Sequence, residues 1–393
     1  MRIGINGSNL IARGAPLGEL VDNAAQAEAD GFSSFWLAQL GYPDALTAIA
    51  AMAPATSMIE IGTAVIPTWS RHPMMLAGQA LTTQEAIGPR LVLGIGLAHK
   101  VTVEGTLKIP FATPAKHMDE YLRVLLPLLA DRRVTSIGDI WSADTEGIGG
   151  TDTGSSPSVM VAAMGPRMLQ LAGERTDGTI LWLSGPKAIA ERIKPALDRA
   201  AADAGRPTPR ILASVPVCVT STPDDVKGIV ASALAGYNDL PSYRGVMDAE
   251  GADGPADVSL IGSAEEVRAG LAAFADAGAT DFAAVELKSP ERLVVCSGQT
   301  AIAEDGSPPT TTDMAEQIVA ALTGLKGVLA ATDMTIADVV KLTIYTTDVD
   351  ELLGAYGAAA DLLAPNMPAM TLIGVTRLAY PELKVEIEAT AAR

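Results

Sequence analysis

The hydrophobic positions of the first 288 residues follow two alternating patterns. Short runs rich in β-branched residues predict eight strands, at residues 2–6, 33–38, 59–66, 90–97, 158–164, 178–184, 210–220 and 280–287. Between them the apolar residues recur with helical spacing, for example at residues 16–30, 73–87, 113–131, 166–175, 186–204 and 263–277. Parallel strands need crossovers of this kind, and eight strands with seven clear crossovers predict an α/β fold, the (β/α)8 or TIM barrel.

The eighth helix of the barrel is missing from this pattern. Residues 280–287 are followed by Ser289-Pro290, which is a turn signal, and then by a new strand pattern. We therefore place the domain boundary here, with residues 1–288 as the barrel and residues 289–393 as a second domain. Residues 282–287 either complete the barrel or pair with residues 294–297 as a hairpin, because a strand buried in one sheet cannot also serve the other. We favour the barrel.

The second domain mixes strand and helix patterns. Strand-like stretches at residues 295–299, 338–348 and 385–391 alternate with helical stretches at residues 314–331 and 351–363. Residues 384–390 alternate with a period of two, which predicts a strand with one buried face. The pattern predicts a small α+β domain. Across the chain, the polar stretches 147–157 and 248–257 are predicted to be flexible loops.

The composition excludes several classes of function. A net charge of −18 argues against nucleic acid and anionic membrane surfaces, because both would be repelled. No apolar run of about eighteen residues and no signal-peptide pattern is present, so we expect a cytoplasmic protein that acts on a small molecule. Cys218 and Cys296 lie far apart in apolar runs without metal-ligand spacing, and we interpret them as buried small hydrophobes. We expect no metal.

Candidate site residues follow the strands, because sites in a TIM barrel gather where strands end and loops begin. These positions hold Asn6, Gln39, Thr63 to Pro67, His99, Glu104 and Met164-Gly165. The stretch Ala163-Met164-Gly165 leads from a strand into a helix that begins at Pro166, so free backbone N–H groups can face an anion. We interpret it as the binding place of a cofactor phosphate.

Only three histidines are present, which narrows the candidates for acid–base chemistry. His99 follows a strand at the expected mouth of the barrel, with Glu104 five residues further on. A neutral imidazole and a carboxylate could shuttle or orient a substrate proton there. His72 begins a helix, where its ring could cap backbone donors, and we interpret it as structural. His117 lies inside a helix and is assigned no role.

Segments of the first domain resemble the bacterial luciferase-like superfamily, whose members use flavin or the deazaflavin coenzyme F420. They are residues 2–7 (RIGING), 35–39 (FWLAQ), 61–65 (IGTAV), 71–73 (RHP), 90–99 (RLVLGIGLAH) and 161–169 (VAAMGPRML). The resemblance implies a non-proline cis peptide beneath the cofactor ring, where Gly62, Thr63, Ala64 and Val65 stand. It also implies cofactor contacts from a further set of residues, namely Asn6, Ala162, Ala163, Met164, Gly165 and Pro166.

One position departs from this family. Several deazaflavin-dependent relatives carry an Asp-His pair after the second strand, where this chain has Ala38-Gln39. Gln39 can hydrogen bond to a ring or a carbonyl but cannot act as an acid or base near neutral pH. The alcohol-oxidising mechanism of those relatives is therefore in doubt. Hydride transfer from a reduced deazaflavin to an unsaturated substrate, or flavin-dependent oxygenation, stays open.

The second domain resembles the Rid (YjgF/YER057c) imine deaminase family through residues 295–299 (VCSGQ), 338–348 (DVVKLTIYTTD) and 385–391 (VEIEATA). Active Rid deaminases hold the substrate carboxylate with an arginine after a Pro-Ala pair, and a glutamate places water. Here Met370 follows Pro368-Ala369, and a thioether cannot make the bidentate contact of an arginine. Glu386 matches the glutamate. The domain is expected to be inactive on 2-aminoacrylate-type imines.

The role left for the Rid-like domain is assembly or the binding of another ligand. The family implies a homo-oligomer, a trimer with clefts between subunits. Alternatively, Met370 and Glu386 line a cleft for a less acidic ligand. For the whole chain three hypotheses stand: an F420-dependent oxidoreductase, an FMN-dependent monooxygenase, and a ligand-binding or scaffold protein without catalysis. His99, Glu104 and Gln39 are the candidate catalytic residues.

Overall fold

The chain folds as two compact units, Met1–Ser289 and Pro290–Arg393. The computed structural model describes residues 1–145, 155–289, 293–303, 305–332, 334–363 and 367–392. Most of the predicted loop at residues 147–157 lies outside the described residues. Each unit has its own hydrophobic core, with Leu93, Phe282 and Tyr121 at the centre of the first and Leu322 and Leu342 in the second.

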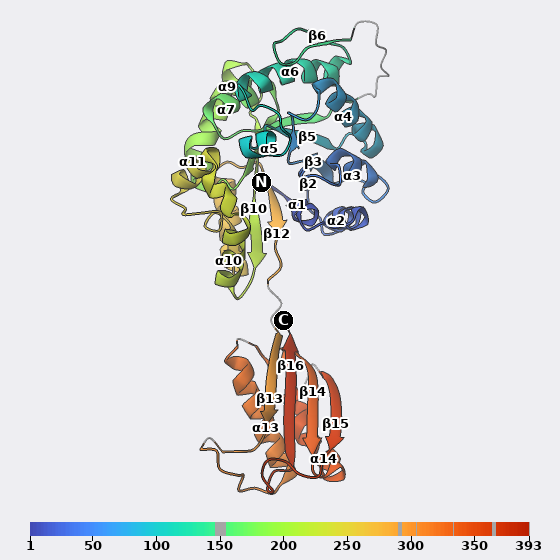
Figure 1. Cartoon of the computed structure of the whole chain (residues 1–393), viewed down its shortest axis with the longest axis vertical. Helices are drawn as coiled ribbons and strands as arrows, with labels where there is room; N and C mark the ends of the chain where they lie inside the picture. The colour runs from blue at the N-terminus through green and yellow to red at the C-terminus, as the bar shows by residue number, and fades with distance from the viewer. Residues whose placement is uncertain (146–154, 290–292, 304, 333, 364–366, 393) are drawn as a thin grey trace. The chain divides into compact units, whose positions relative to one another are not determined.

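Eight parallel strands close into a barrel in the first unit (Figure 1). Neighbouring strands pair in the order of the chain, and the circle closes because β12 pairs with β1 on one side and with β10 on the other. The strands are β1 (Arg2–Asn6), β2 (Ser34–Leu37), β3 (Glu60–Thr63), β5 (Leu91–Gly96), β8 (Ser158–Ala162), β9 (Gly178–Trp182), β10 (Arg210–Val219) and β12 (Asp281–Glu286). The predicted TIM barrel and its eight strands are confirmed.

Two short strands extend this sheet. β4 (Ile66–Pro67) continues β3 and pairs with β5, and β11 (Leu260–Gly262) pairs with the end of β10. Every residue of β2 and β5 is buried, as the continuous apolar runs of strands covered on both faces require. A separate two-stranded ribbon joins β6 (Thr135–Ser136) to β7 (Ala143–Asp144).

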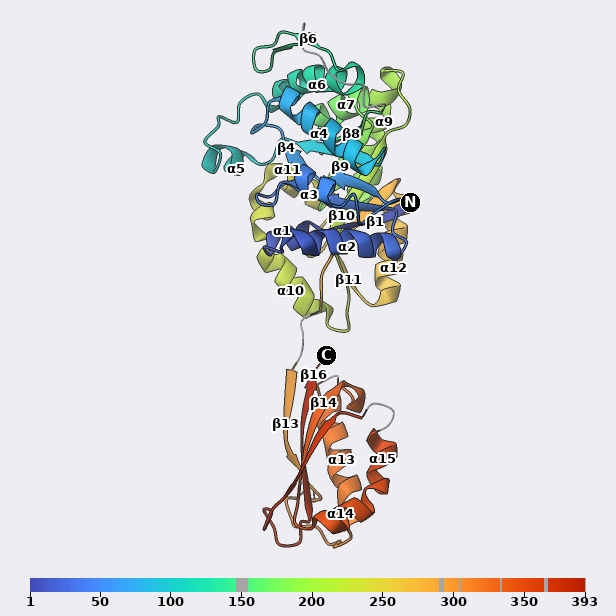
Figure 2. The same cartoon turned by 90° about the vertical axis from the view of Figure 1, so that its right-hand side faces the viewer.

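Helices surround the strands (Figures 1 and 2). The longer ones are α2 (Leu17–Ala29), α3 (Ala45–Ala51), α4 (Pro73–Ile87), α6 (Pro114–Asp131), α7 (Pro166–Arg175), α9 (Lys194–Asp203), α10 (Pro223–Ala233), α11 (Pro241–Glu250) and α12 (Ala264–Asp276). Shorter ones are α1 (Ser8–Ala12), α5 (Lys100–Gly105), α8 (Pro186–Ala188), the π-helical turn η1 (Ile189–Ile193) that joins α8 to α9, and the 3-10 turn η2 (Ala235–Asp239). Several start with proline at the first turn, where the missing N–H would have no helical partner.

One predicted loop is partly wrong. Residues 248–250 belong to α11, and the turn after it is tied down by Arg244, which donates to the carbonyl oxygens of Ala252 and Asp253. The carboxylate of Asp257 also accepts from the backbone N–H of Asp253. Polar and small residues suggested a free loop, but a single arginine satisfies the carbonyl groups there.

The end of the barrel resolves an open alternative. β12 is hydrogen bonded on both edges within the barrel, so residues 281–286 complete it, as favoured above. Residues 287–289 are not helical, and the next described residues, from Leu293, already belong to β13 (Leu293–Gln299) of the second unit. Within the described residues the barrel thus ends without an eighth helix.

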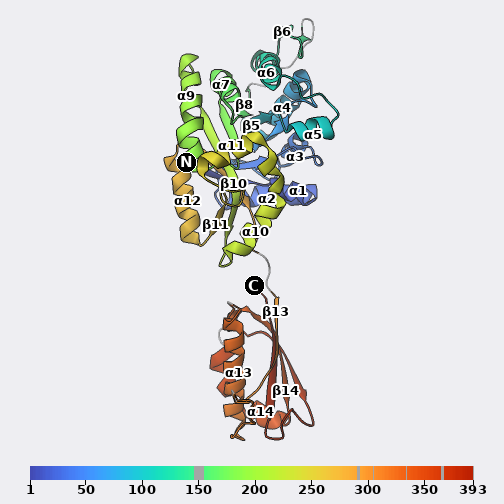
Figure 3. The same ribbon diagram turned by 60° about the vertical axis from the view of Figure 1, so that its left-hand side comes forward.

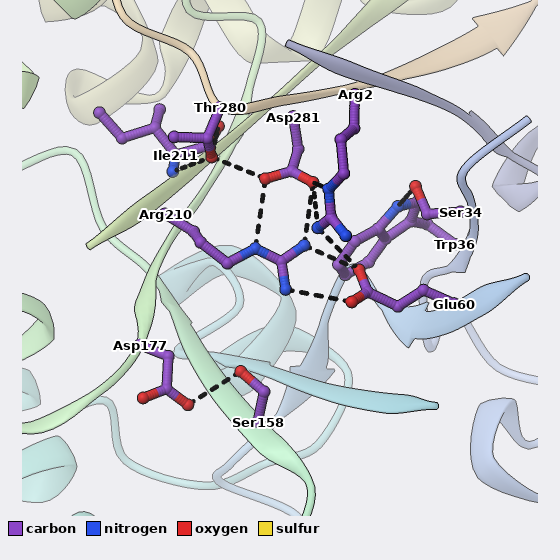
Figure 4. Close-up of polar contacts among 10 residues, drawn as sticks. All are labelled: Arg2, Ser34, Trp36, Glu60, Ser158, Asp177, Arg210, Ile211, Thr280 and Asp281. Atoms are coloured by element: carbon purple, nitrogen blue, oxygen red, sulfur yellow. Dashed lines mark hydrogen bonds and ion pairs between the residues drawn. The ribbon is translucent and has the colours of Figure 1, made fainter. Parts of the chain in front are cut away.

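Charged residues tie together the amino-terminal ends of four barrel strands (Figure 4). The guanidinium of Arg210 donates to Glu60 Oε1 at 2.7 Å and to Asp281 Oδ1 at 2.9 Å. Arg2 donates through Nε to the same Asp281 Oδ1 at 2.8 Å, and Thr280 Oγ1 donates to Oδ2. Burial alone would raise the pKa of Asp281, whose side chain is 2% exposed, but these donors hold it below its ordinary value. The network therefore links the amino-terminal ends of the strands, and we call this end of the barrel its floor.

The second unit is a four-stranded mixed sheet with helices on one face. Its strand order is β13-β16-β14-β15, in which β14 and β15 are parallel and the other pairs antiparallel. The helix α13 packs on β13 and β16 (Figure 3). The elements are β13, α13 (Met314–Ala330), the 3-10 turn η3 (Ile336–Asp338), β14 (Val339–Thr346), α14 (Val349–Ala355), α15 (Gly357–Leu363), β15 (Ala369–Gly374) and β16 (Val385–Ala392).

The predicted α+β domain is confirmed, and β16 shows the predicted alternation of buried and half-buried residues. The pattern missed β15, all six residues of which are exposed. β15 is the edge strand beside β14, and its six residues bury little side-chain surface in a single chain. Both cysteines are free and buried, as predicted.

Candidate functional site

The mouth of the barrel is formed by the carboxyl ends of the strands and the loops that follow them. Asn6, at the end of β1, is buried, and its Nδ2 donates to Ser214 Oγ on β10 at 3.1 Å. Its Oδ1 accepts from the backbone N–H of Ser8 at 3.1 Å. Ser214 Oγ in turn donates to the carbonyl oxygen of Ala283 at 2.7 Å. This chain of hydrogen bonds fixes Asn6 rigidly across the barrel.

The third strand ends in a non-proline cis peptide bond between Ala64 and Val65, where the resemblance places one. Thr63 before it is fully buried, and its Oγ1 donates to Gly94 O at 2.8 Å and accepts from Gly94 N at 2.9 Å. Gly62 packs under the ring of Trp36, which a Cβ would approach to 2.3 Å. Of the four predicted residues, Gly62 and Thr63 thus lie in the packed strand that precedes the cis bond, and Ala64 and Val65 form the bond itself.

Helix α7 begins directly after β8 with an open amino terminus. Ala163 N donates to Thr179 Oγ1 at 3.2 Å, which holds the turn against the neighbouring strand. Gly165 is the N-cap and Pro166 the first helical residue, and no described side chain caps the N–H groups of the first turn. A Cβ on Gly165 would meet no described atom within 4 Å. The turn from Ala162 to Pro166 therefore offers unpaired donors and free space.

Strand β9 leads into a similar helix start, that of α8, whose N–H groups donate to a side chain of the protein. Gly185 and Pro186 follow β9 as Gly165 and Pro166 follow β8. Here the carboxylate of Glu250, from α11, accepts from Ala188 N at 3.0 Å and from Lys187 N at 3.3 Å. A Cβ on Gly185 would collide with Glu250. An anion is thus already present at one of two neighbouring helix starts, and it belongs to the protein.

His99, after β5, lies half-buried between two tyrosine rings. Its ring centre is 5.7 Å from that of Tyr237 and 5.5 Å from that of Tyr243, and both contacts are edge-on. These tyrosines come from η2 and α11. Burial lowers the pKa of His99, so the imidazole is neutral near pH 7. A neutral imidazole in aromatic surroundings can accept a proton or a hydrogen bond.

The other two candidate catalytic residues are engaged in loops. Glu104 is exposed; it accepts from Phe111 N at 3.2 Å and lies 3.9 Å from Lys100 Nζ. No hydrogen bond joins His99 and Glu104 within the described residues. Gln39 Oε1 accepts from Ala45 N at 2.8 Å, and its Nε2 donates to Gly41 O at 2.6 Å.

The two remaining histidines serve the structure, as interpreted for His72; His117 was assigned no role. His72 is the N-cap of α4, and its Nδ1 accepts from Met74 N at 3.2 Å. His117 is fully buried in α6 and stacks on Trp69. Burial lowers the pKa of His117 to about 4, although the nearby Glu120 opposes this shift.

Sequence reasoning missed the aromatic side chains of the mouth. Trp69 and Trp141 contact the ring of His117, Phe111 contacts Trp69, and Trp182 contacts Tyr237. They come from separate parts of the chain, so no spacing in the sequence connects them. Aromatic residues make up only 4% of the chain, and their scarcity was the one available signal.

The two predicted Rid-like cleft residues lie on opposite faces of the sheet in one chain. Met370 pairs with Leu342, whose side chain is in the core below the helices, and Tyr356 Oη lies 3.0 Å from its sulfur. Glu386 pairs with Tyr345 on the other face and lies over Gly298. Met370 and Glu386 of the same copy therefore do not line one cleft.

Comparison with known proteins identifies the barrel. The family model for luciferase-like monooxygenases matches residues 2–281. The chain belongs to the luciferase-like monooxygenase family. The model for endoribonuclease L-PSP, the family of the Rid proteins, matches residues 279–393, so a Rid-type domain follows the luciferase-like one.

The luciferase-like relatives include deazaflavin-dependent proteins. A putative coenzyme F420-dependent oxidoreductase from Mycobacterium tuberculosis is 30% identical over 250 residues, covering 60% of this chain and 70% of that protein. A solved F420-dependent secondary alcohol dehydrogenase, in complex with an F420-acetone adduct, superimposes with a TM-score of 0.59 at 18% identity and covers 74% of this chain and 94% of its own.

A flavin enzyme shares the fold equally well. The oxygenating constituent of 3,6-diketocamphane monooxygenase from Pseudomonas putida, solved with FMN, has a TM-score of 0.59 at 20% identity, covering 73% of this chain and 92% of that chain. At such identities the solved structures show the shared fold alone. Among the described residues, no three metal-binding side chains gather, and no helix is long and apolar enough to cross a bilayer. The chain is a luciferase-like oxidoreductase by family.

Proposed function

We propose that the barrel binds the deazaflavin coenzyme F420 at its mouth and transfers a hydride between it and a small, neutral organic substrate. The observation that carries this proposal is the start of α7, where Gly165 leaves room and described side chains leave the N–H groups uncapped. Such a helix start attracts a phosphate through its N–H groups and its dipole. F420-dependent relatives support the choice of coenzyme.

The residues around the mouth fit such a coenzyme. The small side chains of Ala162, Ala163 and Gly165 permit a phosphate to approach the backbone closely. The bend at Ala64 and Val65, held by buried Thr63, offers a rigid wall for a planar ring. When bound, the coenzyme supplies the hydride, and the protein positions the reactants and excludes water.

His99 is the residue to which we assign the substrate proton. Because burial keeps its imidazole neutral at pH 7, it can accept a proton or a hydrogen bond from the substrate. Tyr237 and Tyr243 shield it from water and leave it without a carboxylate partner among the described contacts. These apolar surroundings favour an uncharged substrate. Gln39 and Glu104 act by positioning the loops on which they lie.

An FMN-dependent monooxygenase is the second candidate. The FMN-bound neighbour from Pseudomonas putida supports it, and FMN also ends in a phosphate that the start of α7 could hold. The two hypotheses therefore share one phosphate site and differ in the ring. Binding selectivity separates them.

The test is a fluorescence titration of the purified full chain with F420 and with FMN. We expect micromolar binding of F420 and a preference over FMN of about tenfold or more, equivalent to about 1.4 kcal/mol. Tighter binding of FMN would favour the monooxygenase. A protein that binds neither would be a ligand-binding or scaffold protein without this chemistry.

For the second unit we propose assembly of the protein, without hydrolysis of 2-aminoacrylate-type imines. The support is Met370, whose sulfur lies against Tyr356 Oη and offers no positive charge to a carboxylate. All six residues of the edge strand β15 are exposed in the single chain. A strand that packs against another copy in the assembled protein would show this exposure. A homotrimer is the expected form.

Met370→Arg tests the missing clamp. We expect the natural protein to hydrolyse the imine at the buffer rate, and M370R to raise that rate measurably because a guanidinium can hold a carboxylate with two hydrogen bonds. Met367→Arg is the control, because Met367 is similarly exposed but lies outside β15. Equal rates in both variants would show that more than the clamp is missing, and analytical ultracentrifugation of the same samples reports the oligomer.

A further inference from the structure

One indole differs from the other three in the chain. The protein has four tryptophans, all within the described residues. Two of them donate their Nε1–H to the protein, Trp36 to Ser34 Oγ at 2.8 Å and Trp141 to His117 Nδ1 at 3.3 Å, and Trp182 is only half-buried at the end of β9. The Nε1 of Trp69 is buried and has no hydrogen-bond partner among the described residues. Trp69 as a whole is 8% exposed.

Trp69 is held in place by aromatic rings. It follows β4, four residues after the cis bond between Ala64 and Val65. Its ring stacks on that of His117 with 3.7 Å between centres and lies 5.2 Å from that of Phe111. The indole therefore has a fixed position at the mouth.

The polar groups of His117 and Thr68, next to Trp69, are not free to accept a hydrogen bond from its Nε1–H. His117 Nδ1 accepts from Trp141, and its Nε2 lies 2.9 Å from Thr68 Oγ1. An imidazole that accepts at Nδ1 and is neutral carries its proton on Nε2, so both ring nitrogens are used. Thr68 Oγ1 lies 3.3 Å from Gly96 O, to which it donates.

We propose that Trp69 Nε1–H donates a hydrogen bond to an acceptor atom on the ring of the bound cofactor. This inference rests on the proposed function, because it requires a ring cofactor at the mouth. Flavin and deazaflavin rings carry carbonyl oxygens at their edge, which are acceptors for a buried N–H. Trp69 is thus a cofactor-binding residue whose donor stays unpaired until the cofactor arrives.

The experiment compares Trp69→Phe with Trp141→Phe. Each change removes one indole N–H and keeps an aromatic ring, but of the two N–H groups only that of Trp141 has a partner among the described residues. In fluorescence titrations W69F is expected to bind the cofactor of the natural protein about tenfold more weakly. W141F is expected to melt at a lower temperature and to bind that cofactor with an affinity close to that of the natural protein.

A second readout uses the indole ¹H–¹⁵N resonances of the natural protein, assigned through their backbone connections, so that it does not depend on how a variant folds. The resonance of Trp69 is expected to move downfield when F420 or FMN binds, as a new hydrogen bond requires. If the natural protein binds a cofactor but this resonance stays in place and W69F binds equally well, the inference is wrong while the proposed function stands. If the natural protein binds neither cofactor, both fail.

Discussion

The charged network at the floor of the barrel and the start of α7 at its mouth treat their polar groups in opposite ways. At the floor, Arg2, Glu60, Arg210 and Asp281 satisfy one another, and the side chain of Asp281 is 2% exposed within the network. At the mouth, the first turn of α7 is uncapped by described side chains, and Trp69 Nε1 is buried without a partner among the described residues. Buried polar groups in folded proteins are nearly always hydrogen bonded, so an unpaired one needs an explanation. For the donors at the mouth, the explanation that we propose is a bound cofactor.

The mouth itself contains a smaller version of this contrast. The starts of α7 and α8 follow adjacent strands with the same Gly-Pro sequence, but Glu250 occupies only the second. Had both been open, neither would stand out as a ligand site. The N–H groups at the start of α8 donate to a carboxylate of the protein itself. The start of α7 has no such carboxylate among the described residues, so it is the place that we assign to the cofactor phosphate.

Asp281→Asn is expected to have the largest effect, at the floor. It removes the charge shared by Arg2 and Arg210, and the expected loss in the free energy of unfolding is about 3–5 kcal/mol, the range for breaking a buried ion pair. Urea unfolding followed by circular dichroism measures it. Asp177→Asn is the control, because Asp177 also lies at the strand starts (Figure 4) but its side chain is 46% exposed, so its loss should stay below about 1 kcal/mol. Equal losses would mean that the floor network does not stabilise the barrel.

The pH dependence of stability should separate the two ends. Burial lowers the pKa of His117 from 6.5 to about 4. Between pH 6.5 and about pH 4 its imidazole is therefore protonated in the unfolded chain but neutral in the folded chain. Its contribution is complete above pH 6.5 and is lost as the pH falls towards about 4, by up to about 3 kcal/mol. The carboxylate of Asp281, whose pKa is lowered, keeps its contribution until the pH falls below its ordinary value of 3.8.

Unfolding midpoints measured between pH 7 and pH 3 check these windows, with His117→Gln as the variant that lacks the titrating ring. In H117Q the decline above pH 4 should be smaller, although the natural contribution of His99, whose pKa is also lowered by burial, remains. The same decline in H117Q and in the natural protein would contradict the assignment.

Gly165→Val sharpens the comparison at the mouth. A valine there meets no described protein atom near its Cβ but fills the space before the N–H groups of α7, so cofactor affinity is expected to fall about a hundredfold, or about 2.7 kcal/mol, without loss of stability. The titration with F420 and FMN measures it. Gly228→Val in α10, another glycine with open space, is the matched control, and Glu250→Gln tests the filled helix start. Full affinity in G165V would remove the phosphate site from α7.

Much of this architecture could be predicted from the chain. Hydrophobic periodicity located all eight barrel strands, and Pro73, Pro114 and Pro166 marked helix starts because proline suits the first turn. The resemblance to the luciferase-like superfamily implied a cis bond within Gly62 to Val65, and the structure has it between Ala64 and Val65. These features depend on neighbouring residues, which is why a local pattern reveals them.

The candidate site was predicted less completely. Asn6, His99 and Gly165 lie at the mouth as expected, because the end of a strand is a position that local pattern reveals. The partners of the first two were not found, since Ser214 and Tyr243 lie far from Asn6 and His99 in the sequence. Nothing in the composition shows that one tryptophan of four lacks an acceptor, because that depends on side chains from several loops.

The sequence by itself determined the eight barrel strands, their order and several helix starts, since these follow from local periodicity and backbone preference. Only the tertiary structure decided that residues 281–286 belong to the barrel, although both family models reach into the stretch around them. A strand has two hydrogen-bonding edges, and in β12 both are occupied by β1 and β10. Likewise, whether a donor is satisfied is a property of the packed neighbourhood, which only the folded chain brings together.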